Sequence, residues 1–218
     1  MLTIQLVRST KRSVISDTGT RERIFRAACG EFAARGFAGG NVDRIAAAAG
    51  VNKAMIYYHF KNKASLYTEI LRDMFQAVAA RLDEMAAQQR TVDGKVRAFV
   101  DAIAHEAEAR PHFPPIWFRE IAEGGTHLDV PTLAIVTSIV RRLASIVREG
   151  VAAGRFQPVN PLLVHGGIIA PLLLFYASAD LRKRIARAGI PGADRFDSRE
   201  VVAHIQSVAL TTLRGRAS

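Results

Sequence analysis

Two short helical segments separated by one glycine are the feature that most constrains how this chain can fold. Apolar residues repeat at the i, i+3, i+4, i+7 spacing of one helical face across residues 42–49, and Gly50 then supplies a permissive turn. Asn52 can cap a second segment, in which Ile56 and Phe60 lie four residues apart and so point inward. Two short helices joined by a tight turn form the helix-turn-helix, whose second helix enters the major groove of DNA. The segment therefore predicts a DNA-binding helix-turn-helix.

The outward face of the second short helix carries the side chains that we expect to read bases. Lys53 can reach the O6 and N7 acceptors of guanine, and Ala54 and Met55 can touch a thymine methyl group. Tyr58 is a further candidate on the same helix, and Arg44 on the preceding helix can reach a base or a phosphate. For each of these residues the alternative is an ordinary solvated surface position.

Phosphate anchoring falls to Tyr57 and Lys63. The phenol of Tyr57 can donate a hydrogen bond, and Lys63 stands where a long helix begins, so that its charge adds to the positive end of that helix. His59 and Lys61 are weaker candidates for the same role. A solvated surface position is again the alternative.

The distribution of charge favours the same interpretation. The net charge is +10, and residues 1–63 hold 11 Lys and Arg against 4 Asp and Glu. Most of the surplus therefore lies on and before the helix-turn-helix, where it would neutralise phosphates, although a solvated basic face would show the same bias. We expect residues 1–17 to form a flexible basic arm. Its Arg8, Lys11 and Arg12 can enter a minor groove or make only diffuse contacts.

The rest of the chain is helical by the same criteria. Apolar periodicity, caps and breakers indicate an all-α fold of about nine helices, and no alternating strand pattern competes with them. The expected helices span residues 18–35, 42–49, 53–60, 63–88, 92–109, 116–123, 131–153, 160–188 and 198–214. The proline-rich corner at residues 111–115 is expected to be non-helical. We interpret residues 18–63 as the DNA-binding domain and residues 64–218 as a second helical domain.

Composition and motifs exclude several other kinds of protein. Cys29 is the only cysteine, so an intrachain disulfide is impossible, which suits a reducing cytoplasm. The longest apolar run, residues 162–177, is too short and too interrupted to span a membrane, and no signal peptide is visible. No GxSxG, HExxH or P-loop motif occurs, and no two histidines have the spacing of a metal site. We therefore expect a cytoplasmic, non-enzymatic protein without a membrane segment, metal or cofactor.

Residues 24–66 resemble the DNA-binding head of the TetR family of transcriptional regulators. The similarity is confined to this segment, and it is specific because many spacings agree together. It is carried by Ile24, Ala28, Phe32, Gly36, Phe37, Val42, Ile45, Ala46, Ala49, Gly50, Val51, Lys53, Ile56, Tyr57, Phe60, Lys63 and Leu66. The resemblance implies nine helices, with the helix-turn-helix near the N-terminus and a C-terminal domain that dimerises and binds a ligand.

The chain departs from the family pattern just before its first short helix. Members of the family usually carry hydroxyl residues there, which cap the helix and touch a phosphate. Here Gly39, Gly40 and Asn41 occupy these positions. Asn41 can still cap the helix, and it belongs to the expected DNA-contacting set. Gly40 has no hydroxyl, so one phosphate contact is either missing or made by a backbone N–H.

One helix-turn-helix makes few base contacts, so we expect a two-fold dimer on a palindromic operator. The segment 162–175 is too apolar for a helix with one buried face, and the last helix is apolar as well. The resemblance implies that these two helices pair with those of a second copy in a four-helix interface. The expected interface residues are Leu162, Ile169, Leu173, Val201, Ile205 and Val208. The alternative is that the same residues form the core of a monomer.

The resemblance also implies a ligand cavity in the C-terminal domain. Apolar walls with a few polar groups are typical of small-molecule sites, and also of an ordinary core. The expected lining residues are Phe99, Ile103, His105, Phe113, Trp117, Phe118, Ile121, Thr137, His165 and Tyr176. Such walls favour a lipophilic ligand over a strongly anionic one.

We expect a repressor that is released from DNA when the ligand shifts the dimer away from its DNA-competent conformation. Two alternatives remain open. One is a ligand-independent DNA-binding regulator whose C-terminal half is only a dimerisation scaffold, and the other is an activator.

Overall fold

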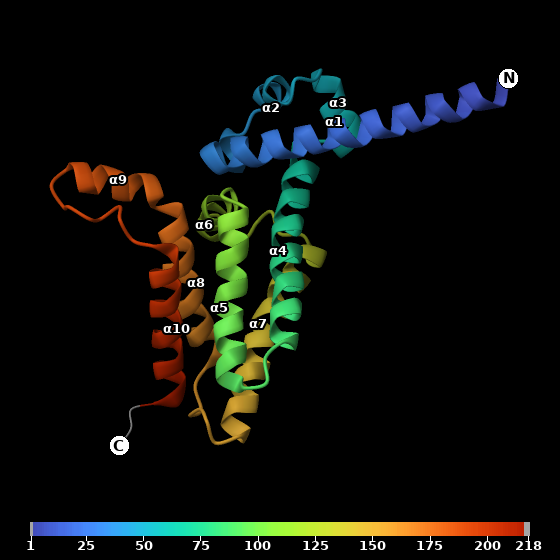
Figure 1. Ribbon diagram of the computed structural model, residues 1–218. Coiled ribbons are helices and arrows are strands. Elements are labelled where there is room, and N and C mark those ends of the chain that lie inside the picture. Colours follow the sequence, from blue (N-terminus) through green and yellow to red (C-terminus); the bar gives the residue numbers. More distant parts are fainter. Residues whose placement is uncertain (1, 216–218) are drawn as a thin grey trace. The chain divides into compact units, whose positions relative to one another are not determined.

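The computed structural model describes residues 2–215, with side chains from residue 18 onward. Within that part of the chain there are ten α-helices and no strand, which confirms the predicted all-α fold (Figure 1). The helices are α1 (Leu2–Gly39), α2 (Val42–Ala49), α3 (Lys53–Phe60), α4 (Lys63–Ala87), α5 (Val92–Ala109), α6 (Phe113–Ala122), α7 (Val130–Ala152), α8 (Pro161–Ala177), α9 (Ala179–Arg187) and α10 (Ser198–Arg214). The side chains of the expected basic arm, residues 1–17, lie outside the described part.

The chain divides into two compact units. The smaller, which we call the head, comprises Met1–Leu71 and Phe118–His127, and the larger, which we call the body, comprises Arg72–Trp117 and Leu128–Ser218. The head contains the helix-turn-helix domain expected at residues 18–63. It also takes in the start of α4 and the end of α6.

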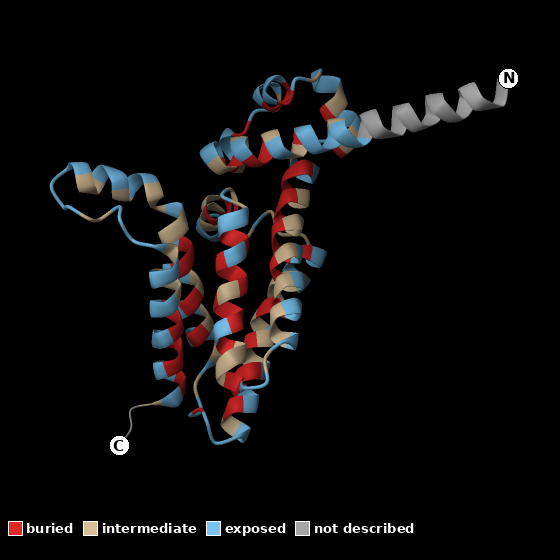
Figure 2. Cartoon of the chain, viewed as in Figure 1, coloured by how far each residue is buried: buried red, intermediate tan, exposed pale blue. Residues whose placement is uncertain are grey.

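The core of the head is formed by the apolar faces that the sequence predicts. The periodic residues of α1, α2, α3 and the start of α4 are buried, while the opposite faces of these helices reach the surface (Figure 2). The buried residues are Ile24, Ala28, Phe32, Ile45, Ala46, Ala49, Ile56, Phe60 and Leu66. Cys29 lies in the same interior.

Two glycines turn the chain of the head, Gly36 after the expected helix 18–35 and Gly50 at the predicted turn. Gly36 has a non-helical backbone (φ 70°, ψ −179°), which kinks α1 near its C-terminal end. Gly50 adopts the left-handed conformation (φ 64°, ψ 41°), and its N–H donates to the carbonyls of Ala46 and Ala47. Glycine is favoured at such a C-cap because a Cβ atom is unfavourable at positive φ.

The body is arranged around α5. Much of this helix is buried, including Val96, Phe99, Val100 and Ile103. It packs against α7, α8 and α10, and α8 packs in turn against α7 and α10. Each of these helices therefore buries one face against a neighbour.

The proline-rich corner that we expected at residues 111–115 is partly helical, so that prediction is wrong. Helix α6 begins at Phe113 rather than at residue 116. Pro114 and Pro115 fall in its first turn, where a backbone N–H has no helical acceptor and its loss costs little.

The helix expected over residues 160–188 is divided into α8 and α9, which are bent by 63°. The break falls at Ser178, where neither Gly nor Pro marks it in the sequence. Arg182 stabilises the bend because its guanidinium donates to the Phe175 carbonyl and to the Ser178 hydroxyl. This division explains why the described part of the chain has ten helices rather than about nine.

Among the described helices α7 is long and apolar enough to cross a membrane, and α8 with α9 passes the same test only as a bent pair. Core helices of water-soluble proteins commonly have this composition, so the observation is weak evidence for a membrane segment.

Gly40 is a point of close packing in the head. A Cβ atom at this position would lie 2.5 Å from Cε1 and 2.6 Å from Cδ1 of Phe32, and 3.1 Å from the Gly36 carbonyl oxygen. Phe32 is fully buried, so its ring has no free space into which to move. The packing explains why no hydroxyl-bearing residue stands here: no side chain fits between the chain and the ring.

Gly40→Ala should therefore destabilise the head, by about 1–3 kcal/mol, because the added methyl group overpacks the Phe32 site. Gly30→Ala is the matched control, since Gly30 is exposed on α1 and an added Cβ would meet no atom within 4 Å. Alanine at residue 30 should stabilise the helix by roughly 0.5–1 kcal/mol. Urea unfolding followed by circular dichroism measures both changes. Equal stability of the two variants would contradict the steric argument.

Candidate functional site

Helix α3 is fixed at its start and exposed along one side. The Asn52 side chain accepts a hydrogen bond from the Ala54 N–H (3.0 Å), which confirms the predicted cap. Ile56 and Phe60 anchor the helix in the core of the head, as expected. The opposite side of α3 is exposed to solvent.

The DNA-contacting candidates on α3 and just after it differ in their exposure. Five of them are exposed: Lys53, Ala54, Tyr57, Tyr58 and Lys61. Met55 and His59 are half-buried. The four that lie on α3 itself are a cation, a small side chain and two phenols.

Lys53 is held by an acidic residue of the preceding helix. Its ammonium lies 2.9 Å from Asp43 Oδ1 and donates to Oδ2 at 3.0 Å. The hydrogen bond to Asp43 raises the pKa of Lys53, because it stabilises the protonated ammonium. Contact between Lys53 and a base would therefore replace this ion pair.

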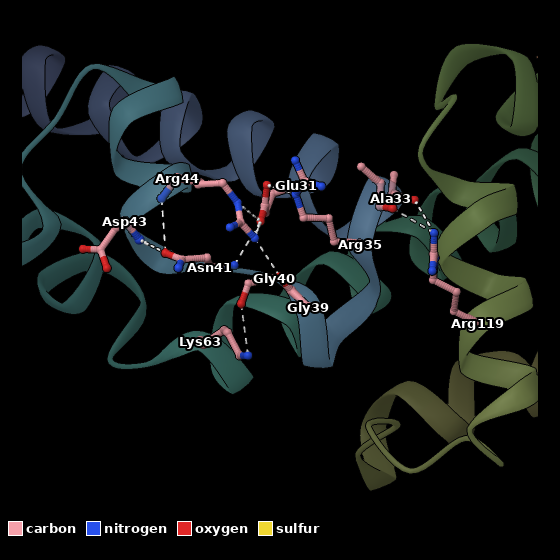
Figure 3. A network of polar contacts seen from close by, with 11 residues as sticks. Glu31, Ala33, Arg35, Gly39, Gly40, Asn41, Asp43, Arg44, Lys63 and Arg119 are labelled. Atoms are coloured by element: carbon pink, nitrogen blue, oxygen red, sulfur yellow. Dashed lines mark hydrogen bonds and ion pairs between the residues drawn. The ribbon is translucent and has the colours of Figure 1, made fainter.

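Arg44, a second DNA-contacting candidate, is bound within the head (Figure 3). Its Nε donates to Glu31 Oε1 (2.8 Å), and its Nη2 donates to the Gly39 carbonyl (2.7 Å). Glu31 also accepts from the Asn41 N–H (3.0 Å) and lies 3.4 Å from Arg35. The hydrogen bond from Arg44 is the main reason why the pKa of Glu31 is lowered. Arg44 therefore joins α1 to α2, a role that the sequence did not indicate.

The connection into α2 has no free N–H at Gly40. The Asn41 side chain caps α2, as predicted, by accepting from the N–H groups of Asp43 (2.7 Å) and Arg44 (3.3 Å). The Gly40 N–H donates to the carbonyls of Gly36 (3.0 Å) and Phe37 (3.2 Å). Of the two alternatives that the sequence left open, these bonds favour a missing phosphate contact at Gly40, because its N–H already donates to two carbonyls.

Lys63 is also engaged inside the head (Figure 3). Its ammonium donates to the carbonyls of Phe37 (3.0 Å) and Gly40 (3.2 Å) and lies 4.5 Å from the centroid of the Phe37 ring. The side chain is half-buried. An ammonium has three hydrogens, so one donor remains for a phosphate after these two bonds.

A loop of contacts from α6 completes the head. Arg119 donates to the carbonyls of Ala33 (3.3 Å) and Ala34 (3.0 Å) at the end of α1 (Figure 3). The fully buried Glu120 accepts from the Tyr67 hydroxyl (3.2 Å), and burial is the main reason why the pKa of Tyr67 is raised. These contacts explain why residues 118–127 belong to the head.

The end of α6 also brings together three groups able to bind a metal, Glu120, Glu123 and His127, which sequence spacing did not indicate. Their ligand atoms lie within 4.8 Å of one another. His127 Nδ1 is 3.1 Å from Glu120 and 3.5 Å from Glu123. The backbone N–H of His127 also donates to Glu120 Oε1 (2.8 Å). Hydrogen bonding within the head accounts for the cluster.

Two cavities lie in the body. The smaller measures about 40 Å³ and is lined by Phe75, Val78, Ile103, Phe113, Trp117, Val136, Ile139, His165, Ile169 and Leu173. The larger measures about 290 Å³ and is lined by Leu82, Asp83, Ala86, Lys95, Phe99, Arg142, Ser145, Ile146 and Glu149. Burial lowers the pKa of His165, so its imidazole is neutral at pH 7.

Half of the expected ligand residues line these cavities. Ile103, Phe113, Trp117 and His165 line the smaller cavity, and Phe99 lines the larger one. The other five line neither: His105, Phe118, Ile121, Thr137 and Tyr176. Their surroundings explain the difference.

The five other residues lie elsewhere for separate reasons. His105 is exposed beside Arg81, and Phe118 and Ile121 belong to the head. The Thr137 hydroxyl donates to the Leu133 carbonyl (2.8 Å), and Tyr176 packs against Phe175. The cavity residues of α4 were missed because its apolar stripe reads equally well as ordinary core.

The outward face of α8 is apolar. Its exposed residues recur at helical spacing and include no charged or hydrogen-bonding side chain: Leu162, Leu163, Gly166, Gly167, Ala170, Pro171, Leu174 and Ala177. Of the residues expected at a dimer interface, Leu162 and Val208 are exposed and Val201 is half-buried. Ile169 and Leu173 line the smaller cavity, and Ile205 is buried in the body. These three face inward because α8 and α10 pack on α5.

Comparison with known proteins agrees with this architecture. The family model described as bacterial regulatory proteins, tetR family, matches residues 24–70. The chain is 31% identical over 156 residues to the HTH-type transcriptional repressor SCO4008 of Streptomyces coelicolor, covering 72% of this chain and 73% of that protein. It is 24% identical over 197 residues to the repressor NicS of Pseudomonas putida, covering 89% and 92%.

Solved structures share the fold. The ketosteroid transcriptional regulator KstR2 of Mycobacterium tuberculosis has a TM-score of 0.71 at 18% identity, covering 90% of this chain and 95% of that chain. FadR of Bacillus subtilis, in complex with stearoyl-CoA, has a TM-score of 0.66 at 16% identity, covering 88% and 98%. At these identities the likeness shows the fold alone.

Glu31→Gln should lower the stability of the head at pH 7 by about 1 kcal/mol, because Arg44 is half-exposed and its ion pair is partly screened. The folded-state pKa of Glu31 is lowered, so its contribution is present above the ordinary pKa of 4.5 and is lost as the pH falls through the folded value. The difference between wild type and variant should therefore shrink from pH 7 toward pH 3.

Urea unfolding across this pH range measures the effect of Glu31→Gln. Glu22→Gln is the matched control, because Glu22 pairs with Arg26 on the same helix with both side chains exposed. Equal effects of the two variants at pH 7 would contradict a special role for Glu31.

Proposed function

Because the chain belongs to the TetR family of bacterial regulatory proteins, which are non-enzymatic, DNA-binding transcription factors, we propose that it is a dimeric cytoplasmic repressor released from a palindromic operator by a small lipophilic ligand. The observation that carries the proposal is the exposed face of α3, which presents Lys53, Ala54, Tyr57 and Tyr58 from a helix anchored in the core of the head.

The contacts with DNA divide between bases and phosphates. Lys53, Ala54 and Met55 stand at the start of α3, which is the part of a recognition helix that reaches base edges. Tyr57 and Lys61 are exposed and suited to phosphates, and Lys63 offers one remaining hydrogen. Asp43 competes with DNA for Lys53, so it disfavours sites that offer that lysine no acceptor.

Repression rather than activation is favoured by the relatives. SCO4008 and NicS are both named as repressors. Another relative, FasR of Mycolicibacterium smegmatis, is named as an activator and is 30% identical over a shorter stretch of 92 residues. The DNA-reading surface is the same in either role, so the sign of regulation depends on where the operator lies.

The outward face of α8 supports dimerisation. It is apolar along its length, and its Gly166, Gly167 and Ala170 allow a partner helix to approach closely. The exposed face of α10 adjoins it and adds Val208. Two such helix pairs, one from each copy, would form an isologous four-helix contact with the same residues on both sides.

The cavities of the body support a ligand. The smaller has walls that are apolar apart from one neutral histidine, which suits a lipophilic group. KstR2 is described as a ketosteroid transcriptional regulator, and FadR was solved with stearoyl-CoA, whose acyl chain is apolar and whose CoA part is charged. A protein of this fold can therefore hold a ligand with a long apolar part. Residues of α4 line both cavities, and the start of the same helix belongs to the head. A ligand that moves α4 could therefore affect the helices that we propose to contact DNA.

Selection of bound sequences from random double-stranded DNA tests the DNA-binding function. Lys53→Ala should relax the preference at one operator base pair, by about tenfold, because it removes a base contact. Lys61→Ala is the matched control: it should weaken binding to all sequences alike and lower the salt dependence by about one unit of log K per log salt. Fluorescence anisotropy over a range of salt concentrations measures both. A salt-independent affinity would overturn the proposal, and a uniform loss in Lys53→Ala would reassign Lys53 to phosphate.

Ala170→Arg should convert the dimer to a monomer, because it places a charge in the middle of the apolar face of α8. Ala87→Arg is the control, since Ala87 is exposed at the end of α4. Sedimentation velocity gives the mass of each variant. A dimer that persists unchanged in Ala170→Arg would show that α8 does not form the interface.

A further inference from the structure

The two cavities of the body follow one another along the same three helices. On α4, Val78 lines the smaller cavity and Leu82 the larger, one helical turn apart. On α5, Ile103 and Phe99 stand in the same relation. Helix α7 likewise contributes to both. An elongated molecule lying along these helices would contact both cavities.

The larger cavity combines an apolar floor with a charged rim. Leu82, Phe99 and Ile146 are buried at its base. Arg142 makes a bidentate pair with Asp83, at 2.7 Å for both hydrogen bonds. Lys95 donates to both carboxylate oxygens of Glu149, also at 2.7 Å.

The two signs of charge are not equally placed on this rim. The cations lie deeper, with side-chain exposures of 31% for Arg142 and 25% for Lys95. The carboxylates are more exposed, at 64% for Asp83 and 50% for Glu149. Arg142 also donates to the Ser138 hydroxyl (2.7 Å) on its own helix, so its position does not depend on Asp83 alone. The carboxylates are therefore the partners that an incoming group would displace.

We propose that the ligand of the body is an amphiphilic anion, with a carboxylate or phosphate bound by Arg142 and Lys95 and an unbranched apolar tail along Leu82 and Phe99 toward the smaller cavity. This proposal rests on the proposed function and names the class of ligand. It modifies the expectation from composition, which favoured a lipophilic ligand over an anionic one, because the apolar walls and the two cations occupy successive parts of one path.

An anionic head group fits the rim better than the alternatives. It would exchange one oxygen anion for another at each cation, so neither cation loses its charged hydrogen bonds. A cationic head group would have to displace Arg142 and Lys95 from the deeper positions. An uncharged head group would leave the Arg142–Asp83 and Lys95–Glu149 ion pairs intact and would gain no charged hydrogen bond.

The apolar path is narrow at its inner end. A cavity of about 40 Å³ has room for little more than one water molecule. A tail that enters it must therefore widen the space between the helices that line it. Affinity should rise with tail length along the larger cavity, by about fourfold for each methylene group buried, and then level off.

The only tryptophan of the chain reports on this path, because Trp117 lines the smaller cavity. Four probes with a ten-carbon chain separate the head groups: decanoate, whose chain includes the carboxylate carbon, decyl phosphate, decanol and decyltrimethylammonium, each below its micelle concentration. Tryptophan fluorescence and thermal unfolding measure binding. Decanoate and decyl phosphate should bind at least tenfold more tightly than decanol, and the ammonium compound most weakly. The stronger of the two anions identifies carboxylate or phosphate as the head group.

Two substitutions with opposite expected effects test the rim. Arg142→Gln should abolish the preference for decanoate over decanol, whereas Asp83→Asn should strengthen decanoate binding several-fold, because it removes the competing carboxylate. Arg148→Gln is the control, since Arg148 is exposed on the same helix and lines neither cavity. A purely structural ion pair would not give tighter binding when Asp83 is neutralised.

The outcomes separate this proposal from the proposed function. Equal binding of decanol and decanoate, or no gain in Asp83→Asn, overturns the anionic ligand, while release of DNA by any of the probes would still support a ligand-regulated repressor. Tight, head-group-selective binding that leaves operator affinity unchanged supports the site and counts against ligand-controlled release. Operator affinity in the presence of each probe is measured by fluorescence anisotropy.

Discussion

The position of the helix-turn-helix depends on the contact between Gly40 and the ring of Phe32. A side chain at residue 40 would come within 2.5 Å of that ring, so the chain can leave α1 along this surface only without one. The carbonyl of Gly40 then faces Lys63, which donates to it at 3.2 Å, and Asn41 follows at a fixed place to cap α2. Through the turn at Gly50, α2 sets the direction of α3. The packing at Gly40 thus leaves no side chain at that position, and it fixes the path by which the chain reaches α2 and α3.

Periodicity predicts which residues of the head are buried, but it does not predict what the charged residues do. Ile24 and Phe32 follow from spacing because the burial of a helical face repeats with every turn. The bond between Arg44 and Glu31 joins positions 13 residues apart on two helices, and Lys63 reaches a carbonyl 26 residues earlier. No rule of spacing specifies such pairs. The surplus of positive charge in the sequence therefore does not show which cations are available to DNA, since residues such as Arg44 and Lys63 already bond within the head.

In the body, by contrast, the apolar pattern of one helix does not show which of its residues are buried. Helix α8 is apolar on almost every side, so its sequence carries no signal of direction. Packing on α5, α7 and α10 decides that Ile169 and Leu173 face a cavity while Leu163 and Ala170 face outward. The break at Ser178 has a different origin, because Arg182 stabilises it through local bonds to Ser178 and Phe175, four and seven residues earlier, and no Gly or Pro marks the position. Fold class follows from local pattern, whereas the choice of face needs the tertiary structure.

Charged groups are used differently in the two units, and this difference bears on how a ligand could act. In the head, Lys63 and Arg119 donate to backbone carbonyls, whose positions are fixed by the turn and the helix end that carry them. In the body, Arg142 and Lys95 pair with half-exposed carboxylates, and such pairs contribute little to stability in water. A ligand shifts a conformational equilibrium only by binding one state better than another. If the ligand is an amphiphilic anion, the exchange of carboxylates at Arg142 and Lys95 supplies almost none of this difference in affinity between the two states. The tail supplies it, since the tail needs more space than the smaller cavity offers and so favours the state in which the lining helices stand further apart.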